Sequence, residues 1–305
     1  MGKIVAVVNQ KGGVAKTTTA VSLAAGLAAE GKKTLLIDID PQGNATSGLG
    51  LSLPAGSPSI YEILINDLQA SQVVLASNYE NLALLPSSLQ LAGAEIELVG
   101  AQARENKLKK ALQGLADLYN YIIIDCPPSL GLLTLNALAA ADSILIPLHC
   151  EYYALEGVGH LMNTYNLVKR HLNPALAIEG VLLTMFDART NLSIQVVDSV
   201  KEFFGRQVFD AIIPRNVRLS EAPSHGLPIY YYDPKSKGAE SYCRFVLEFL
   251  ARNQDPGLSV LAPLEEEKPA VSSPVGDMKP VDLSKSGSSS FLSRSRKKKR
   301  VTSNK

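Results

Sequence analysis

The sequence predicts an α/β fold in which a single doubly wound, mostly parallel sheet is flanked by helices. Seven apolar runs bounded by turn residues have the length of strands, and several are continuous, as is typical of strands buried on both faces of a parallel sheet. Helix-length segments separate them in a βαβα alternation. The composition shifts after residue 252, so we predict one domain over residues 1–252 and a disordered tail over residues 253–305.

The expected elements follow one another along the whole of the predicted domain. The strands are expected at residues 3–8, 34–37, 82–85, 121–124, 143–147, 178–183 and 208–213. The helices include residues 17–30, 105–118, 155–171, 192–204 and 239–252. Because the alternation is continuous, one doubly wound domain accounts for all of it.

Composition excludes several classes of protein. The chain has 305 residues, 46% apolar and 19% charged, which is ordinary for a globular protein. It has no uninterrupted apolar stretch long enough to span a membrane and no secretory leader, so we expect a cytoplasmic protein without transmembrane association. The three cysteines are too few and too scattered for a disulfide framework or a CxxC metal site, and we expect them to be reduced and buried.

Charge is distributed unevenly between the domain and the tail. Residues 253–305 carry 10 basic and 6 acidic side chains, whereas residues 1–252 carry 20 and 23, so bulk charge does not by itself indicate nucleic-acid binding. The tail is rich in Pro, Ser, Gly and Lys and ends in a basic cluster at residues 294–300. That cluster could bind DNA or an anionic membrane, and a solvated tail is an equal alternative.

A glycine-containing loop leads from the first expected strand directly into an Ala/Leu-rich helix. Such a loop presents backbone N–H groups and the positive helix end to an anion. Lys16 is placed to reach the β- and γ-phosphates of a nucleotide, and Thr17 supplies a hydroxyl for Mg²⁺. The loop departs from the GxxxxGK[ST] pattern, because Gln10 and Ala15 occupy the positions of the two outer glycines.

Acidic residues follow two other expected strands. Asp38 and Asp40 come at the end of the second strand, and Asp125 follows the apolar strand at residues 121–124. Ligands gather at the carboxyl ends of a parallel sheet, and a single Asp there is the Walker B arrangement that holds Mg²⁺ directly or through water. The alternative is that each Asp caps the turn that follows it.

Residues 11–18 resemble the deviant Walker A loop of the MinD/ParA class of ATPases. Most members have glycine where this chain has Ala15, so a positive φ there would carry a conformational cost. The resemblance implies that Lys11 reaches the nucleotide of a second subunit, which would couple ATP binding to homodimerisation; the alternative is a solvated loop lysine. It also implies that Asp40 orients the attacking water and that Asp38 lies beside the Mg²⁺ shell. The residues expected to bind ATP in this loop are Lys11, Gly12, Gly13, Val14, Ala15, Lys16, Thr17 and Thr18.

Segments 38–50, 150–157 and 213–223 are similar to the ParA/Soj family of chromosome-partitioning ATPases, and the resemblance covers about residues 2–250. It implies that Pro214 and Asn216 lie in the loop that holds the adenine. It also implies that Arg189 and Arg218 contact DNA. Arginine grips phosphate oxygens without reading bases, so such binding should be nonspecific and weakened by salt. The alternative for either arginine is a surface salt bridge.

The family resemblance implies a partition cycle. ATP and Mg²⁺ would close a homodimer that binds double-stranded DNA, and a ParB-type centromere-binding protein would stimulate ATP hydrolysis with Lys11, Lys16 and Asp40 as catalytic residues. The protein would segregate chromosomes or plasmids as a nucleoid-associated cytoplasmic ATPase. The main alternative is a MinD-like membrane-positioning ATPase, although the Pro and Ser residues around Phe291 do not suit an amphipathic anchor. An iron–sulfur reductase and a bacterial tyrosine kinase fit less well, because Cys126 directly follows Asp125 and the tail lacks tyrosine.

Overall fold

The structure is a computed structural model that describes residues 2–54, 56–151 and 154–254. Within these ranges, eight strands form one sheet in the order β3-β4-β2-β5-β1-β6-β7-β8. The strands are β1 (Lys3–Val7), β2 (Thr34–Asp38), β3 (Leu75–Ala76), β4 (Leu82–Leu85), β5 (Tyr121–Asp125), β6 (Ser143–His149), β7 (Ala177–Phe186) and β8 (Val208–Pro214). Every neighbouring pair is parallel except β3 and β4, which are antiparallel.

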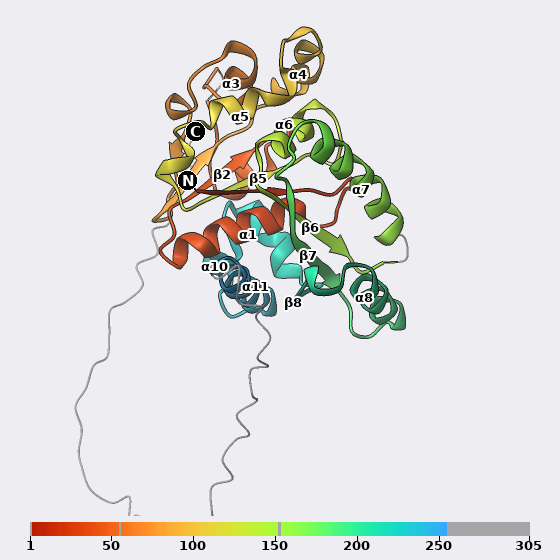
Figure 1. The fold of residues 1–305 in the computed structure, drawn as a ribbon. Coiled ribbons are helices and arrows are strands. Elements are labelled where there is room, and N and C mark those ends of the chain that lie inside the picture. The colour runs from red at the N-terminus through yellow and green to blue at the C-terminus, as the bar shows by residue number, and fades with distance from the viewer. Residues whose placement is uncertain (1, 55, 152–153, 255–305) are drawn as a thin grey trace, which may run out of the picture. The chain divides into compact units, whose positions relative to one another are not determined.

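Helices cover both faces of this sheet (Figure 1). One face is covered by α3 (Ile60–Asn66), α4 (Leu91–Glu97), α5 (Lys107–Ala111), α6 (Leu132–Ala140), α7 (Ala154–His171) and α8 (Asn191–Phe204). The other is covered by α1 (Lys16–Ala29), α2 (Asn44–Gly48), α9 (Val217–Glu221), α10 (Ile229–Tyr232) and α11 (Lys237–Gln254). The prediction of a doubly wound, mostly parallel sheet is therefore confirmed.

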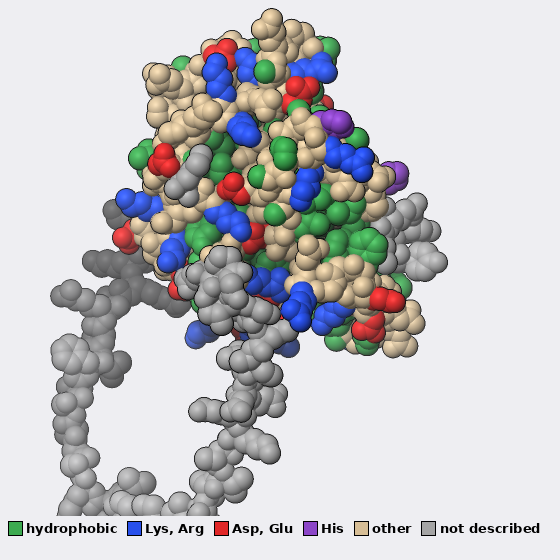
Figure 2. All heavy atoms as spheres, viewed as in Figure 1, with side chains coloured by type: hydrophobic (Ala, Val, Ile, Leu, Met, Phe, Trp, Pro, Cys, Tyr) green, Lys and Arg blue, Asp and Glu red, His purple; other side chains and the backbone are tan. Residues whose placement is uncertain are grey.

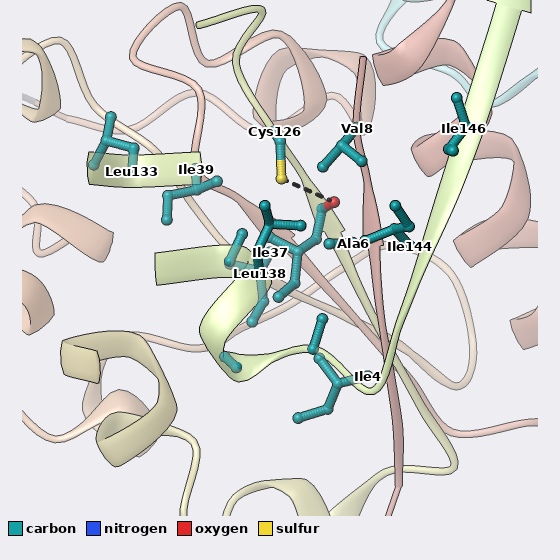
Figure 3. Close-up of a cluster of buried hydrophobic side chains, with 14 of the residues drawn as sticks. Ile4, Ala6, Val8, Ile37, Ile39, Cys126, Leu133, Leu138, Ile144 and Ile146 are labelled. Carbon is teal, nitrogen blue, oxygen red and sulfur yellow. Dashed lines mark hydrogen bonds between the residues drawn. The ribbon is translucent and has the colours of Figure 1, made fainter. Parts of the chain in front are cut away.

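The central strand β1 supplies both cores, because successive side chains of a strand point to opposite faces. Ile4 and Ala6 belong to the core under α3–α8, together with Val8, which directly follows the strand. Figure 3 shows these three side chains among the isoleucines and leucines of neighbouring elements. Val5 and Val7 belong to the core under α1 and α11. Burial on both sides explains why the run is continuously apolar.

The structure also corrects details of the sequence prediction. The two-residue edge strand β3 was not predicted, and the helix expected at 105–118 is shorter, since α5 spans Lys107–Ala111 with single 3₁₀ turns on either side. Cys126 and Cys150 are buried as expected, but Cys243 is exposed, so the prediction was wrong for that residue. The predicted tail lies almost wholly outside the described residues and stays a prediction.

Candidate nucleotide-binding site

The candidate site lies where the carboxyl ends of β1, β2 and β5 meet. Strand β5 pairs with both of the others, and its register places Asp125 opposite Asp38 of β2 and opposite Val7 of β1. The glycine-containing loop follows β1 and ends at Lys16, the first residue of α1. The parallel topology thus brings the loop and the two carboxylates to one edge of the sheet, as predicted.

Side chains and unusual backbone angles hold the loop in place. Asn9 accepts a hydrogen bond from the Lys11 backbone N–H (3.0 Å) and donates to the Pro147 carbonyl (2.8 Å). The carbonyl of Val14 accepts from the Thr184 hydroxyl (3.1 Å). Ala15 is the N-cap of α1 at φ 66° and ψ 33°, in the left-handed region. The expected strain at Ala15 is therefore present.

Lys16 is buried at the centre of the site. Its side chain is 7% exposed, and its ammonium group donates to the Lys11 carbonyl over 2.9 Å. Burial lowers the pKa of Lys16, while the negative charges of Asp125 and Asp40 act in the opposite direction. Among the described residues, the ammonium group of Lys16 donates to a backbone carbonyl rather than to a carboxylate, so an anion at the loop would be a better partner.

Asp125 is the least satisfied group in the site. Both carboxylate oxygens are buried, and neither accepts a hydrogen bond of normal geometry from the described residues. Burial raises the pKa of Asp125 well above its ordinary range, and neighbouring Asp38 adds to the rise, while Thr17 and Lys16 act against it. The turn-capping alternative does not apply to this carboxylate. The Thr17 hydroxyl lies beside this carboxylate, and the remaining lone pairs can accept a ligand.

Asp38 and Asp40 differ from Asp125 because protein donors surround them. Asp38 accepts from the Thr46 backbone and hydroxyl (both 2.8 Å), and burial raises its pKa to about 6 against those bonds. Asp40 is 8% exposed and accepts from the Gln42 backbone over 2.9 Å. Both carboxylates therefore make the turn contacts that the alternative interpretation expects, while lying next to Asp125 and Lys16.

Lys11 forms an ion pair within its own subunit. Its ammonium group contacts Glu151, and the other carboxylate oxygen of Glu151 lies 3.2 Å from the His149 ring nitrogen Nδ1. Burial lowers the pKa of His149, and the charges of Arg215 and Lys11 lower it further. Lys11 is thus not simply a solvated loop residue. The pairing with Glu151 was not predicted, and only chain folding brings these two residues together.

A cavity of about 350 Å³ opens beside the loop, between α1 and the ends of β7 and β8. Ala15, Thr18 and Pro214 contribute to its wall. Asn216 also lines it, and its side-chain oxygen accepts from the Arg218 backbone (2.9 Å), which caps α9. The remaining lining residues are Thr184, Met185, Ile213, Arg215, Val217, Leu219, Ser220 and Tyr242. The structure thus brings both residues predicted for the adenine loop to one cavity next to the glycine-containing loop.

The two arginines predicted to contact DNA both carry acidic partners. Arg189 is 86% exposed and makes two bonds to Asp187, of 2.8 and 2.7 Å. Arg218 pairs with Glu221 (2.9 Å) and Asp233 (3.3 Å). The salt bridges of the alternative interpretation are therefore formed. Basic and acidic side chains are also mixed over the face shown in Figure 2, so no single-sign field marks it.

Comparison with known proteins supports the predicted family. A family model described as an AAA domain matches residues 2–178. The sporulation initiation inhibitor protein Soj of Bacillus subtilis is 59% identical over 251 residues, which cover 82% of this chain and 99% of that protein. The chromosome partitioning protein ParA of Myxococcus xanthus is 56% identical over 253 residues, 83% of this chain and 89% of that protein. The chain belongs to the Soj/ParA family of chromosome-partitioning ATPases.

A solved structure extends the Soj/ParA comparison to a nucleotide-bound relative. Cobyrinic acid a,c-diamide synthase from Mycobacterium smegmatis, solved with an ATP analogue and magnesium, is 39% identical with a TM-score of 0.73, and the match covers 84% of this chain and 97% of that chain. Within the described ranges, no helix is both long enough and apolar enough to cross a bilayer. The fold and the family predicted from the sequence are thus confirmed.

Proposed function

We propose that this member of the Soj/ParA family hydrolyses ATP to ADP and phosphate in a DNA-partitioning cycle. ATP and Mg²⁺ bind, two subunits close into a homodimer, the dimer binds double-stranded DNA nonspecifically, and hydrolysis releases it. The observation that carries the proposal is the meeting of buried Lys16 with the fully buried Asp125 carboxylate at the helix N-terminus of a phosphate-type loop. The names of its relatives, Soj and ParA, supply the biological context.

Nucleotide binding would use the loop and the neighbouring cavity. The backbone N–H groups of residues 12–18 and the positive end of α1 suit the phosphates, and Lys16 would exchange the Lys11 carbonyl for a phosphate oxygen. Thr18 and Pro214 line the cavity, which continues from the loop toward Asn216, where the base would lie. Each of these groups binds or orients the nucleotide.

The acidic residues fit a magnesium ion. Within the described ranges, no three His, Cys, Asp or Glu side chains group into a metal site of their own, so an ion would complete its shell with phosphate and water oxygens, as Mg²⁺ commonly does. The buried Asp125 carboxylate and the neighbouring Thr17 hydroxyl would hold it, with Asp38 beside its water shell. Bound Mg²⁺ would neutralise charge that develops on the phosphates.

Hydrolysis would depend on Asp40 and Lys11. One oxygen of Asp40 accepts from the Gln42 backbone, and the other would orient the attacking water. Lys11 would leave Glu151 and reach the nucleotide of the second subunit, where a positive finger supplied in trans can contribute roughly 10³ to 10⁵ in rate. Dimerisation would therefore complete the active site.

Arg189 and Arg218 would bind DNA phosphates after exchanging their carboxylate partners, which makes binding sensitive to salt. A ParB-type protein would stimulate hydrolysis through a basic N-terminal peptide, and the ATPase would occupy the nucleoid within the cytoplasm. This part of the proposal rests on the family alone, because residues 1–252 are mildly acidic and their net charge does not by itself indicate DNA binding.

The proposal is tested with four proteins: wild type, Lys16→Ala, Asp40→Ala and Arg218→Glu. Lys16→Ala should lose nucleotide binding, Asp40→Ala should accumulate as an ATP-bound dimer in size-exclusion chromatography, and Arg218→Glu should dimerise without binding DNA. A monomeric Asp40→Ala protein at saturating ATP would refute the dimer. Liposome co-sedimentation with ATP, in the same salt as duplex DNA binding, tests the MinD-like alternative; lipid binding without DNA binding would favour it.

A further inference from the structure

Two hydroxyl side chains close a hydrogen-bonded ring that joins the Asp38 carboxylate to the Asp40 backbone. The Asp40 backbone N–H donates to Asp38 Oδ1 (3.2 Å), and the Asp40 carbonyl accepts from Ser87 Oγ (2.6 Å). The Ser87 backbone N–H donates to Thr46 Oγ1 (3.1 Å), which donates to Asp38 Oδ2 (2.8 Å). The four residues of this Asp38–Thr46–Ser87–Asp40 ring are 0%, 5%, 4% and 8% exposed.

The ring fixes the backbone of Asp40 from both sides. Its N–H and its carbonyl each have one partner in the ring, so the peptide groups that flank the Asp40 side chain cannot rotate independently. Buried hydrogen bonds of this kind are strong because water does not compete for them. The Gln42 backbone N–H bonds the Asp40 carboxylate directly, and the Gly43 N–H bonds the Asp40 carbonyl. Thr46 and Ser87 add to these local bonds by fixing the Asp40 backbone from more distant parts of the chain.

The ring also joins three separate parts of the chain. Asp38 ends β2, Thr46 lies in α2, and Ser87 follows β4, the neighbour of β2 in the sheet. The segment that carries Ser87 is anchored in turn to α3, because the Ile60 backbone donates to the Pro86 carbonyl (2.9 Å) and the Ser59 and Ser88 hydroxyls lie 2.9 Å apart. These bonds therefore fix the position of Ser87, whose hydroxyl in turn bonds the Asp40 carbonyl.

We propose that Thr46 and Ser87 are positioning residues for ATP hydrolysis, which hold Asp40 where it can orient the attacking water. The inference rests on the proposed function, since it requires that Asp40 acts in hydrolysis. It assigns no contact with the nucleotide to either hydroxyl. Removal of a ring bond should therefore lower kcat and leave the affinity for ATP unchanged.

The test uses Thr46→Val, which keeps the shape of the side chain, and Thr46→Ser, which restores the hydroxyl. Thr46→Val should lower kcat by about 10- to 100-fold, as expected when a reacting group is misplaced by a fraction of an ångström to 1 Å. The Kd for an ATP analogue should not change, and Thr46→Ser should recover most of kcat. Because Ser87→Ala breaks the same ring, the double variant should lose less than the product of the two single losses.

Matched controls separate positioning from stability. Thr34→Val removes a buried threonine hydroxyl that bonds the Lys32 carbonyl (2.9 Å) at the opposite end of β2. Ser143→Ala removes a buried serine hydroxyl that bonds Glu179 (2.6 Å). Both should retain wild-type kcat even where the midpoint of thermal unfolding falls.

Each outcome decides between the ring and the wider proposal. The positioning role of the ring would be refuted by full kcat in a folded Thr46→Val protein, by equal losses of kcat and ATP affinity, or by no recovery with Thr46→Ser. These outcomes refute the ring alone if the wild type is active and Asp40→Ala is not. Failure of both Thr46→Val and Ser87→Ala to fold would assign the ring a structural role instead. An inactive wild type would overturn the proposed function and this inference with it.

Discussion

Replacement of Ala15 by glycine should stabilise the protein. Ala15 lies at φ 66°, where a side chain with a Cβ costs about 1–2 kcal/mol, and this cost disappears in Ala15→Gly. Glycine also has more conformational entropy than alanine in the unfolded chain, which reduces this stabilisation by about 0.4–1 kcal/mol. Since glycine is preferred over alanine at helix N-caps as well, the free energy of unfolding should rise by about 1 kcal/mol.

Two control variants test whether the stabilisation expected for Ala15→Gly comes from its left-handed backbone conformation. Gly13 lies in the same loop at φ 71°, and a Cβ there would have no atom within 4 Å, so Gly13→Ala should destabilise for conformational reasons alone, by about 1 kcal/mol. Ala29 is the exposed last residue of α1, where the backbone is helical. Ala29→Gly should therefore cost about 0.5–1 kcal/mol, although the substitution is the same as at Ala15.

Urea unfolding of the nucleotide-free proteins measures all three variants. The midpoint should rise for Ala15→Gly and fall for the other two, with an unchanged slope m. A lower midpoint for Ala15→Gly, in line with Ala29→Gly, would refute the reasoning, because it would mean that the left-handed conformation of Ala15 costs nothing in the folded protein.

Three more predictions concern charges and thiols. Glu151→Gln removes the partner of Lys11, so sedimentation should show more dimer at subsaturating ATP. Glu221→Gln removes a partner of Arg218 and one negative charge, so duplex DNA should bind severalfold more tightly at low salt and lose this gain at high salt. A thiol reagent should modify Cys243 alone in the native protein and all three cysteines after unfolding, since burial raises the pKa of the other two, that of Cys150 to about 12.

Glu240→Gln is the control for both charge variants. Glu240 pairs with Arg244 (2.6 Å) on the exposed side of α11, so it changes the net charge equally without touching Lys11 or Arg218. An equal gain in DNA affinity with Glu240→Gln would show that bulk charge, not the release of Arg218, is responsible. Unchanged dimerisation of Glu151→Gln would mean that the ion pair between Lys11 and Glu151 does not restrain dimer formation. Fast labelling of more than one thiol in the native protein would contradict the burial of Cys126 and Cys150.

The sequence predicted where the site would form but not how its parts contact each other. Asp38 and Asp125 each end a buried apolar run, which was enough to place them at the carboxyl edge of the sheet. In the structure β2 and β5 are neighbours, and their register sets the two carboxylates opposite each other. This arrangement is a property of strand order, which the apolar runs do not encode. The link between Ser87 and Asp40 has the same origin, since the two residues are 47 positions apart.

The exposure of Cys243 could not be read from the sequence either. In α11 the buried apolar positions are Ala239, Tyr242, Phe245, Val246, Phe249 and Leu250. Cys243 follows Ala239 by four residues and precedes Val246 by three, so helical spacing places it beside this stripe, although the structure exposes it. The two-residue strand β3 is likewise too short for any period to be recognised.

The ion pair between Lys11 and Glu151 is compatible with a role for Lys11 in a second subunit because the pair is weak. The two side chains are 39% and 34% exposed, and exposed pairs of this kind contribute only about 0–1 kcal/mol. The triphosphate of a bound nucleotide carries several negative charges in a partly enclosed site, where the same ammonium group gains more. Exchange of Glu151 for the nucleotide of a second subunit should therefore be favourable overall. In that case Glu151 keeps Lys11 ordered before dimerisation and opposes its transfer only slightly.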